Sequence, residues 1–185
     1  SRLMALLQTP PEGTSKTDWL LQRAQASLLS GKARPGIADV EAAFSGDPGI
    51  GLDRYEDALA ILFDLQTIGR HAEAEGFFSR LQKLKLNAQQ RRELWFWRAE
   101  SAKALKKPED AAMMYLRSAT ALGPFAMDPW AQTARFNAAE SLEEAGLLLD
   151  AKNLYTALLS VTDEPGRAAL LRYKLQQIKI KSSNR

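Results

Sequence analysis

Few residues in this sequence could do catalytic or metal chemistry. There is no cysteine and only one histidine, His71. The lack of cysteine excludes disulfides, thiol nucleophiles, Cys-ligated zinc and iron–sulfur clusters. A single histidine excludes a His-rich metal site and argues against a Ser-His-Asp arrangement. We therefore expect no bound metal and no cofactor.

Two further patterns were weighed as catalytic or ligand sites. The stretch Gly46-Asp-Pro-Gly-Ile-Gly51 has the glycine content of a phosphate-binding loop. It lacks the Gly-Lys-Ser/Thr that would follow, no strand precedes it, and Pro48 removes an N–H donor, so we interpret it as a connection. The adjacent Glu143 and Glu144 point in different directions on one helix, which does not support paired acid–base chemistry. The prediction is that the protein is not an enzyme.

Helical periodicity dominates the elements that would position any site. Between Asp53 and Gly69, apolar residues recur at i, i+4 and i+7, and no comparable segment alternates with a period of two. Start signals agree, with capping boxes expected at Asp53 and Asn87 and a capping Asp128 before a proline. The fold class is therefore all-α. Helices are expected at 17–30, 36–45, 53–69, 71–85, 88–105, 108–122, 129–146, 148–161 and 165–181.

A repeat emerges when the helix pairs are aligned. In three copies a turn residue is followed five positions later by alanine and, four positions after that, by an aromatic residue. A short turn reverses the chain, the small alanine permits close approach of the two helices, and the aromatic fills the gap between hairpins. The three triplets are Gly69, Ala74 and Phe78; Lys106, Ala111 and Tyr115; and Gly146, Ala151 and Tyr155.

This pattern resembles the second half of the tetratricopeptide repeat, whose residues follow the same order and spacing. A degenerate fourth copy has Gly31 at its turn and Gly36 in place of alanine. The resemblance implies a right-handed superhelix of stacked antiparallel helix hairpins, an α-solenoid. The expected organisation is an extended N-terminal segment at 1–16, four hairpins, a C-terminal capping helix at 165–181 and a tail at 182–185. The hairpins are expected at 17–45, 53–85, 88–122 and 129–161.

In that family the first helix of each repeat lines a concave groove, and register carries the groove positions onto this chain. The groove would hold aromatic residues beside carboxylates, which suits a peptide with apolar anchors and basic side chains. The alternative is that the phenylalanines pack between helices and the glutamates form a solvated face. A clamp for a C-terminal carboxylate is not expected, because glutamates surround Lys103. The candidate residues are Leu59, Phe63, Phe96, Glu100, Lys103, Phe136, Glu140, Glu143 and Glu144.

Two unusual segments also carry expectations. The run Trp95-Phe96-Trp97 cannot point three rings to one helix face, so at least one ring should be partly exposed. The segment from Gly123 to Trp130 is apolar for a loop. We expect it to tuck under the hairpins or to form a lip of the groove.

Charge is distributed in bands along the chain. The net charge is +3 and the pI is about 9.2, but residues 165–185 contain six basic and no acidic residues, and residues 108–164 contain nine acidic and three basic ones. The basic pI therefore does not describe a basic groove, and a nucleic-acid partner is not expected.

Three functions were compared. The leading hypothesis is a non-enzymatic protein–protein interaction scaffold within a larger assembly. The alternatives are a nucleic-acid-binding helical repeat and an accessory subunit of envelope machinery for secretion, polysaccharide or lipid assembly. No apolar run reaches the ~20 residues of a membrane span. The chain begins with Ser, as a processed periplasmic chain or an excised domain would, which slightly favours the periplasm over the cytoplasm.

Overall fold

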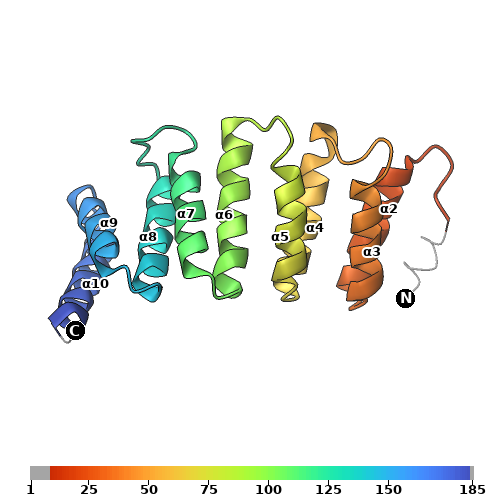
Figure 1. Cartoon of the computed structure of the whole chain (residues 1–185). Coiled ribbons are helices and arrows are strands. Elements are labelled where there is room, and N and C mark those ends of the chain that lie inside the picture. The colour runs from red at the N-terminus through yellow and green to blue at the C-terminus, as the bar shows by residue number, and fades with distance from the viewer. Residues whose placement is uncertain (1–8, 184–185) are drawn as a thin grey trace. The chain divides into compact units, whose positions relative to one another are not determined.

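The computed structural model describes residues 9–183, and within that range all regular structure is helical. The elements carry the labels of Figure 1. They are α2 (Lys16–Leu29), α3 (Ala33–Phe44), the 3₁₀ helix η1 (Leu52–Arg54), α4 (Tyr55–Thr67), α5 (His71–Leu81), α6 (Ala88–Ala104), α7 (Pro108–Thr120), α8 (Pro129–Glu144), α9 (Leu148–Ser160) and α10 (Pro165–Ser183). The all-α prediction is confirmed.

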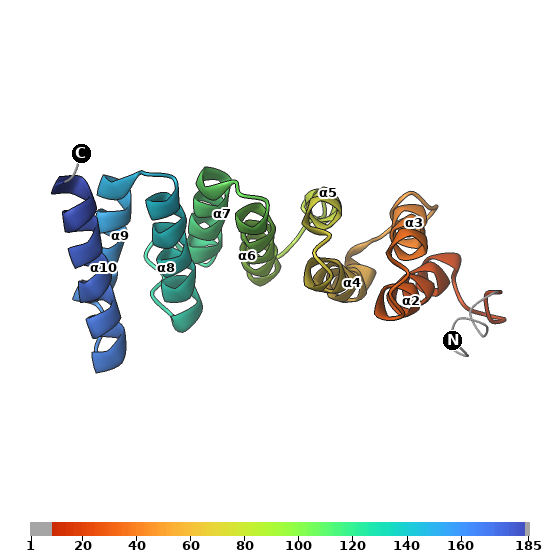
Figure 2. The ribbon, with the colours of Figure 1, turned by 90° about the horizontal axis from the view of Figure 1, so that it is seen from below.

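The chain forms two compact units, residues 1–86 and 87–185. In the first unit α2 packs against α3 and α4, and α4 against α5. In the second, each helix from α6 to α10 packs against the next, and Figure 2 shows α8, α9 and α10 side by side. The boundary between the units coincides with the expected boundary between the second and third hairpins.

Four hairpins turn in the same way. Each turn residue of the aligned repeat, Gly31, Gly69, Lys106 and Gly146, has a positive φ, between 59° and 78°. In each turn this residue donates its N–H to the carbonyl three positions back, and the next residue donates to the carbonyl five positions back. These bonds satisfy carbonyl groups that a helix end otherwise leaves unpaired. The repeat predicted from the sequence is therefore a repeat of backbone geometry.

The small residues explain how closely each pair of helices approaches. Ala74, Ala111 and Ala151 are completely buried. In the degenerate copy, a Cβ on Gly36 would lie 2.8 Å from the side chain of Leu28 and 3.1 Å from the carbonyl oxygen of Ala24. Glycine replaces alanine there because α3 approaches α2 more closely than a methyl group allows. The aromatics Phe78, Tyr115 and Tyr155 are also fully buried.

Several helix boundaries differ from the prediction. The capping box at Asn87 and the cap at Asp128 are confirmed. The capping box at Asp53 is wrong, because Asp53 lies in η1, pairs with Arg54, and leaves α4 to begin at Tyr55.

Other helix ends shift by two to four residues. The helix expected to begin at 36 begins at Ala33, with a proline in its first turn. The helix expected to end at 85 ends at Leu81, where i to i+3 bonds replace helical ones. Helix α10 continues through Ser183, so residues 182 and 183 are not part of a tail. The expected extended segment 1–16 lies outside the described residues up to position 8, and residues 9–15 precede α2 without forming a helix.

The α7–α8 loop tucks in only in part. Ala126 and Trp130 pack against the buried cluster of Ala119, Ala131 and Ala134, whereas Phe125 is 90% exposed. The buried guanidinium of Arg135 donates to the carbonyl oxygens of Pro124, at 3.2 Å, and of Ala126. Gln132 donates to the carbonyl of Met127 at 2.7 Å. The expectation that this segment tucks under the hairpins therefore holds for Ala126 and Trp130 and is wrong for Phe125.

The turn geometry yields a stability prediction at Lys106, the one turn position of the four without glycine. Lys106 has φ of 59°, a conformation that costs an L side chain about 1 kcal/mol relative to glycine. We expect Lys106→Gly to raise the free energy of unfolding by about 1 kcal/mol in urea denaturation. Lys106→Ala keeps the strained Cβ and is the control. Equal stability of both variants would contradict the explanation.

Candidate partner-binding site

Two of the four carboxylates predicted for the groove of the second unit, Glu140 and Glu143, form ion pairs within the chain. Glu140 on α8 lies 2.9 Å from Nζ of Lys174 on α10 and 3.7 Å from Nζ of Lys103 on α6. Glu143 lies 2.5 Å from Nζ of Lys181 and 3.7 Å from that of Lys174. These ion pairs of Glu140 and Glu143 with Lys103, Lys174 and Lys181, called the ladder below, join α6, α8 and α10. We call first-type the helices that begin a hairpin, namely α2, α4, α6 and α8, together with α10, which follows the last hairpin.

Two repeat tyrosines extend this ladder into the core. The Tyr115 hydroxyl donates to Glu100, and the Tyr155 hydroxyl donates to Glu143 at 3.3 Å. The pKa of Tyr115 and of Tyr155 is raised far above the ordinary value. Burial is the main cause, and the neighbouring glutamates are the second. Glu144, one residue beyond the ladder, is exposed to solvent.

Lys174 is the cation at the centre of the ladder. Burial alone would lower its pKa, but the hydrogen bond and the attraction of Glu140 and Glu143 outweigh that effect and raise the pKa above 10.5. Lys174 therefore remains charged beside the two carboxylates at neutral pH.

The aromatic candidates of the second unit make packing contacts. Phe96 lies edge-on to Tyr115 and Trp130, with ring centroids 5.5 and 5.1 Å apart. Phe136 lies 5.7 Å from Tyr155 and packs on the cluster formed by α8, α9 and α10. Both rings remain partly exposed. All three rings of the Trp95-Phe96-Trp97 run are likewise partly exposed, as expected for at least one of them.

In the first unit the two candidates differ. Leu59 is only 2% exposed and belongs to the core, so it does not line an open surface. Phe63, one turn further along α4, is half-buried.

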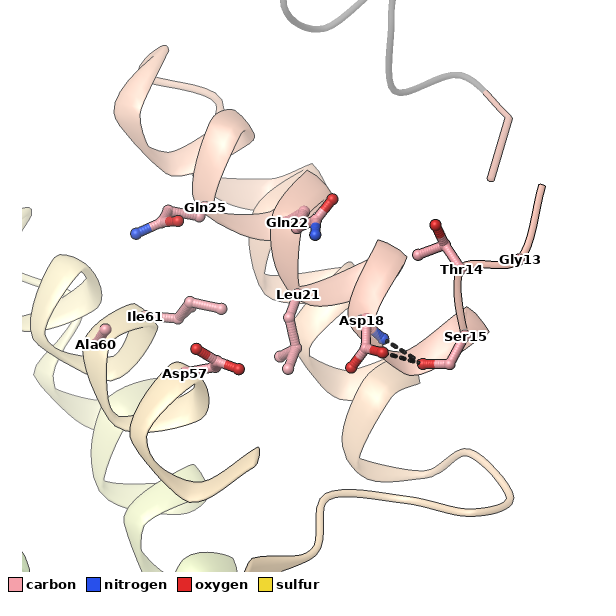
Figure 3. Close-up of a pocket in the computed structure, with 10 residues that line it drawn as sticks. All are labelled: Gly13, Thr14, Ser15, Asp18, Leu21, Gln22, Gln25, Asp57, Ala60 and Ile61. Carbon is pink, nitrogen blue, oxygen red and sulfur yellow. Dashed lines mark hydrogen bonds between the residues drawn. The ribbon is translucent and has the colours of Figure 1, made fainter. Parts of the chain in front are cut away.

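An open pocket of about 450 Å³ lies between α2 and α4 of the first unit (Figure 3). From α2 and the residues before it come Ser15, Asp18, Leu21, Gln22 and Gln25, together with Gly13 and Thr14. From α4 come Asp57, Ala60 and Ile61. The lining therefore combines carboxylates, amides and two branched aliphatic side chains.

The three carboxylates in and beside this pocket differ in their hydrogen-bond partners and burial. Asp18 accepts from Arg54 at 2.5 Å and from Ser15 at 2.6 Å, and these hydrogen bonds lower the pKa of Asp18 below its ordinary value. Asp57 is exposed and has no hydrogen bond or ion pair within residues 9–183. Asp64, one turn beyond Ile61, has its pKa raised by burial, an effect that the hydrogen bond from Gln25 opposes. Asp57 is the carboxylate available to a ligand.

Sequence reasoning missed this pocket, but a signal for it existed. The groove register, applied to α2, selects Asp18, Leu21 and Gln25, and all three line the pocket. The first copy of the repeat is degenerate, with Gly36 in place of alanine. On α4 the lining residues Asp57 and Ile61 lie on a face adjacent to the expected one, and only the packing of α2 against α4 reveals it.

Comparison with models of known families, with curated proteins and with solved structures finds no match. In the part of the chain that the structure describes, no group of three or more His, Asp or Glu residues could hold a metal ion. Over the same residues, no helix combines the length and the apolar character needed to cross a bilayer.

The buried tyrosines and Lys174 predict a loss of stability in alkaline solution. Each raised pKa means that the folded chain holds a proton that the unfolded chain releases above about pH 10. Their contribution is complete below that pH and is lost as pH rises, by about 1.4 kcal/mol per pH unit for each tyrosine. We expect Tyr115→Phe and Tyr155→Phe to flatten this slope in urea denaturation between pH 9 and 11.5.

Tyr173→Phe is the matched control, because that ring is exposed on α10. The same slope in all three variants would show that the buried hydroxyls are not responsible.

Proposed function

We propose that this protein is a non-enzymatic interaction scaffold of tetratricopeptide type, a helical solenoid that binds a peptide bearing apolar and basic side chains. The open pocket between α2 and α4 carries the proposal. It is lined by Asp57, which forms no hydrogen bond or ion pair within residues 9–183, and by Leu21 and Ile61.

The second unit supplies an internal example of the proposed recognition. Helix α10 presents Lys174 and Lys181 to the carboxylates of α8, and it buries Leu171 and Ile178 in the adjacent core. A helix with apolar anchors and basic side chains is the ligand chemistry expected from the sequence. In the second unit α10 itself makes these contacts, so an external ligand there would have to displace α10.

Within residues 9–86, the described part of the first unit, no helix occupies this pocket. A basic side chain of a ligand would reach Asp57, and the amides of Gln22 and Gln25 would satisfy peptide groups. An apolar side chain would pack on the exposed Ala60 and on the small part of Leu21 and Ile61 that remains accessible, 4% and 3%. Burying an apolar anchor supplies affinity, and the charge pair sets orientation and association rate.

A peptide-display selection against the whole chain tests the proposal. We expect enrichment of sequences that combine Lys or Arg with Leu, Ile or Phe. Synthetic versions should bind with an affinity that Asp57→Lys weakens about tenfold or more, measured by titration calorimetry, because a like charge replaces the attraction.

Glu56→Lys is the control, since Glu56 is exposed on the same helix and does not line the pocket. It makes the same charge change and should bind as the unchanged chain does. Enrichment of acidic peptides, or equal weakening by both variants, would contradict the pocket assignment.

A further inference from the structure

Two features of the second unit remain unexplained by a peptide-binding pocket in the first. One is the exposed Phe125 on the α7–α8 loop. The other is an apolar pocket of about 550 Å³ between α9 and α10, lined by Leu175 and Ile178 and by Lys152, Thr156, Gln176, Lys179, Ser182 and Ser183.

The α7–α8 loop presents the side chain of Phe125, called the knob below, to solvent. Leu122 and Met127 beside it are also exposed, at 48% and 38%. The loop is held by a buried charge, because Arg135 directs its guanidinium to the loop's carbonyl groups, and burial lowers the pKa of Arg135. A buried cation is costly, and here it fixes a loop whose most apolar residue points into solvent. Because the hydrogen bonds from Arg135 already hold the loop backbone, binding through Phe125 requires less ordering of that backbone.

The charges near the knob are satisfied within the chain. Asp128, at the end of the loop, caps α8 and pairs with the buried Arg92. The knob therefore offers apolar surface rather than charge, and it suits an apolar pocket. The pocket between α9 and α10 is mainly apolar and meets this requirement; Leu175 is partly exposed in it, and Ile178, at 2% exposed, lies at its buried side.

The knob cannot reach this pocket within one chain. The loop precedes α8, whereas Lys152 and Thr156 follow the turn at the far end of α8. The sixteen residues of α8 separate the two ends by about 24 Å. In Figure 1 the loop and the C-terminal end of α10 accordingly lie at opposite ends of the helices.

We infer that Phe125 of one copy of this chain inserts into the α9–α10 pocket of a second copy. The contact is heterologous, since knob and pocket are different surfaces, and each copy keeps one unused knob or pocket for the next. The association therefore extends beyond a dimer as the concentration rises.

Sedimentation velocity with the whole chain, from about 1 µM to about 1 mM, measures this association. We expect the average mass to rise with concentration. Phe125→Asp removes the knob and Thr156→Arg fills the pocket. Both positions are exposed, so each variant should fold, as circular dichroism would verify, and remain monomeric.

A mixture of the two variants is the sharpest arm of the experiment. Phe125→Asp retains the pocket and Thr156→Arg retains the knob, so the mixture should form a one-to-one dimer and nothing larger. Leu170→Asp, on an exposed part of α10 outside the pocket, should associate as the unchanged chain does.

Three results would overturn the inference. They are a monomer at all concentrations for the unchanged chain, undiminished association of Phe125→Asp, or a mixture of the variants that stays monomeric. Phe125-dependent binding to phosphatidylcholine vesicles by a chain that stays monomeric would assign the knob to a lipid surface instead.

Discussion

The close approach of the two helices in each hairpin is the constraint on which the rest of the structure depends. A residue with positive φ reverses the chain, and five positions later a residue with little or no side chain lies against the preceding helix. Gly36 shows how strict the requirement is, because a Cβ there would lie 2.8 Å from Leu28. The fixed spacing places the buried aromatic one helical turn further on, where it fills the space between neighbouring helices.

The helices that stack next to one another bring different side chains together in the two units. In the second unit Glu140 and Glu143 of α8 pair with Lys174 and Lys181 of α10, and the Tyr155 hydroxyl donates to Glu143. Glu143 has only 10% of its side chain exposed, so its charge is favourable only because partners surround it. In the first unit, among residues 9–86, the space between α2 and α4 is an open pocket, and Asp57 lines it without a hydrogen bond or ion pair to the described residues. One architecture thus gives a closed and an open version of the same surface.

The all-α class and the four hairpin turns were predictable from the sequence, because turn, small residue and aromatic recur at fixed spacing and report local geometry. The candidate site was less predictable. Register placed Glu140 and Glu143 on the inner side of α8, but no local pattern indicated that lysines some thirty to forty residues later would pair with them. The exposure of Phe125 was also not predictable, because the loop backbone beside it is held by hydrogen bonds from Arg135, about ten residues later in the chain. The ion pairs of α8 and the structure of the α7–α8 loop both depend on contacts between charged side chains and groups well separated from them in the sequence. The periodicity of the sequence does not predict such contacts.

The most direct test of the central constraint enlarges one small residue and measures unfolding in urea. Ala111→Leu adds three carbon atoms where α7 meets α6, and overpacking of this kind costs about 2 kcal/mol or more. Ala169→Leu makes the same change at an exposed position of α10 and should stay within about 0.5 kcal/mol of the unchanged chain. A marked loss of stability for Ala111→Leu alone is the predicted result. Equal stability of the two variants would contradict the claim that close helix approach at the small residue holds each hairpin together.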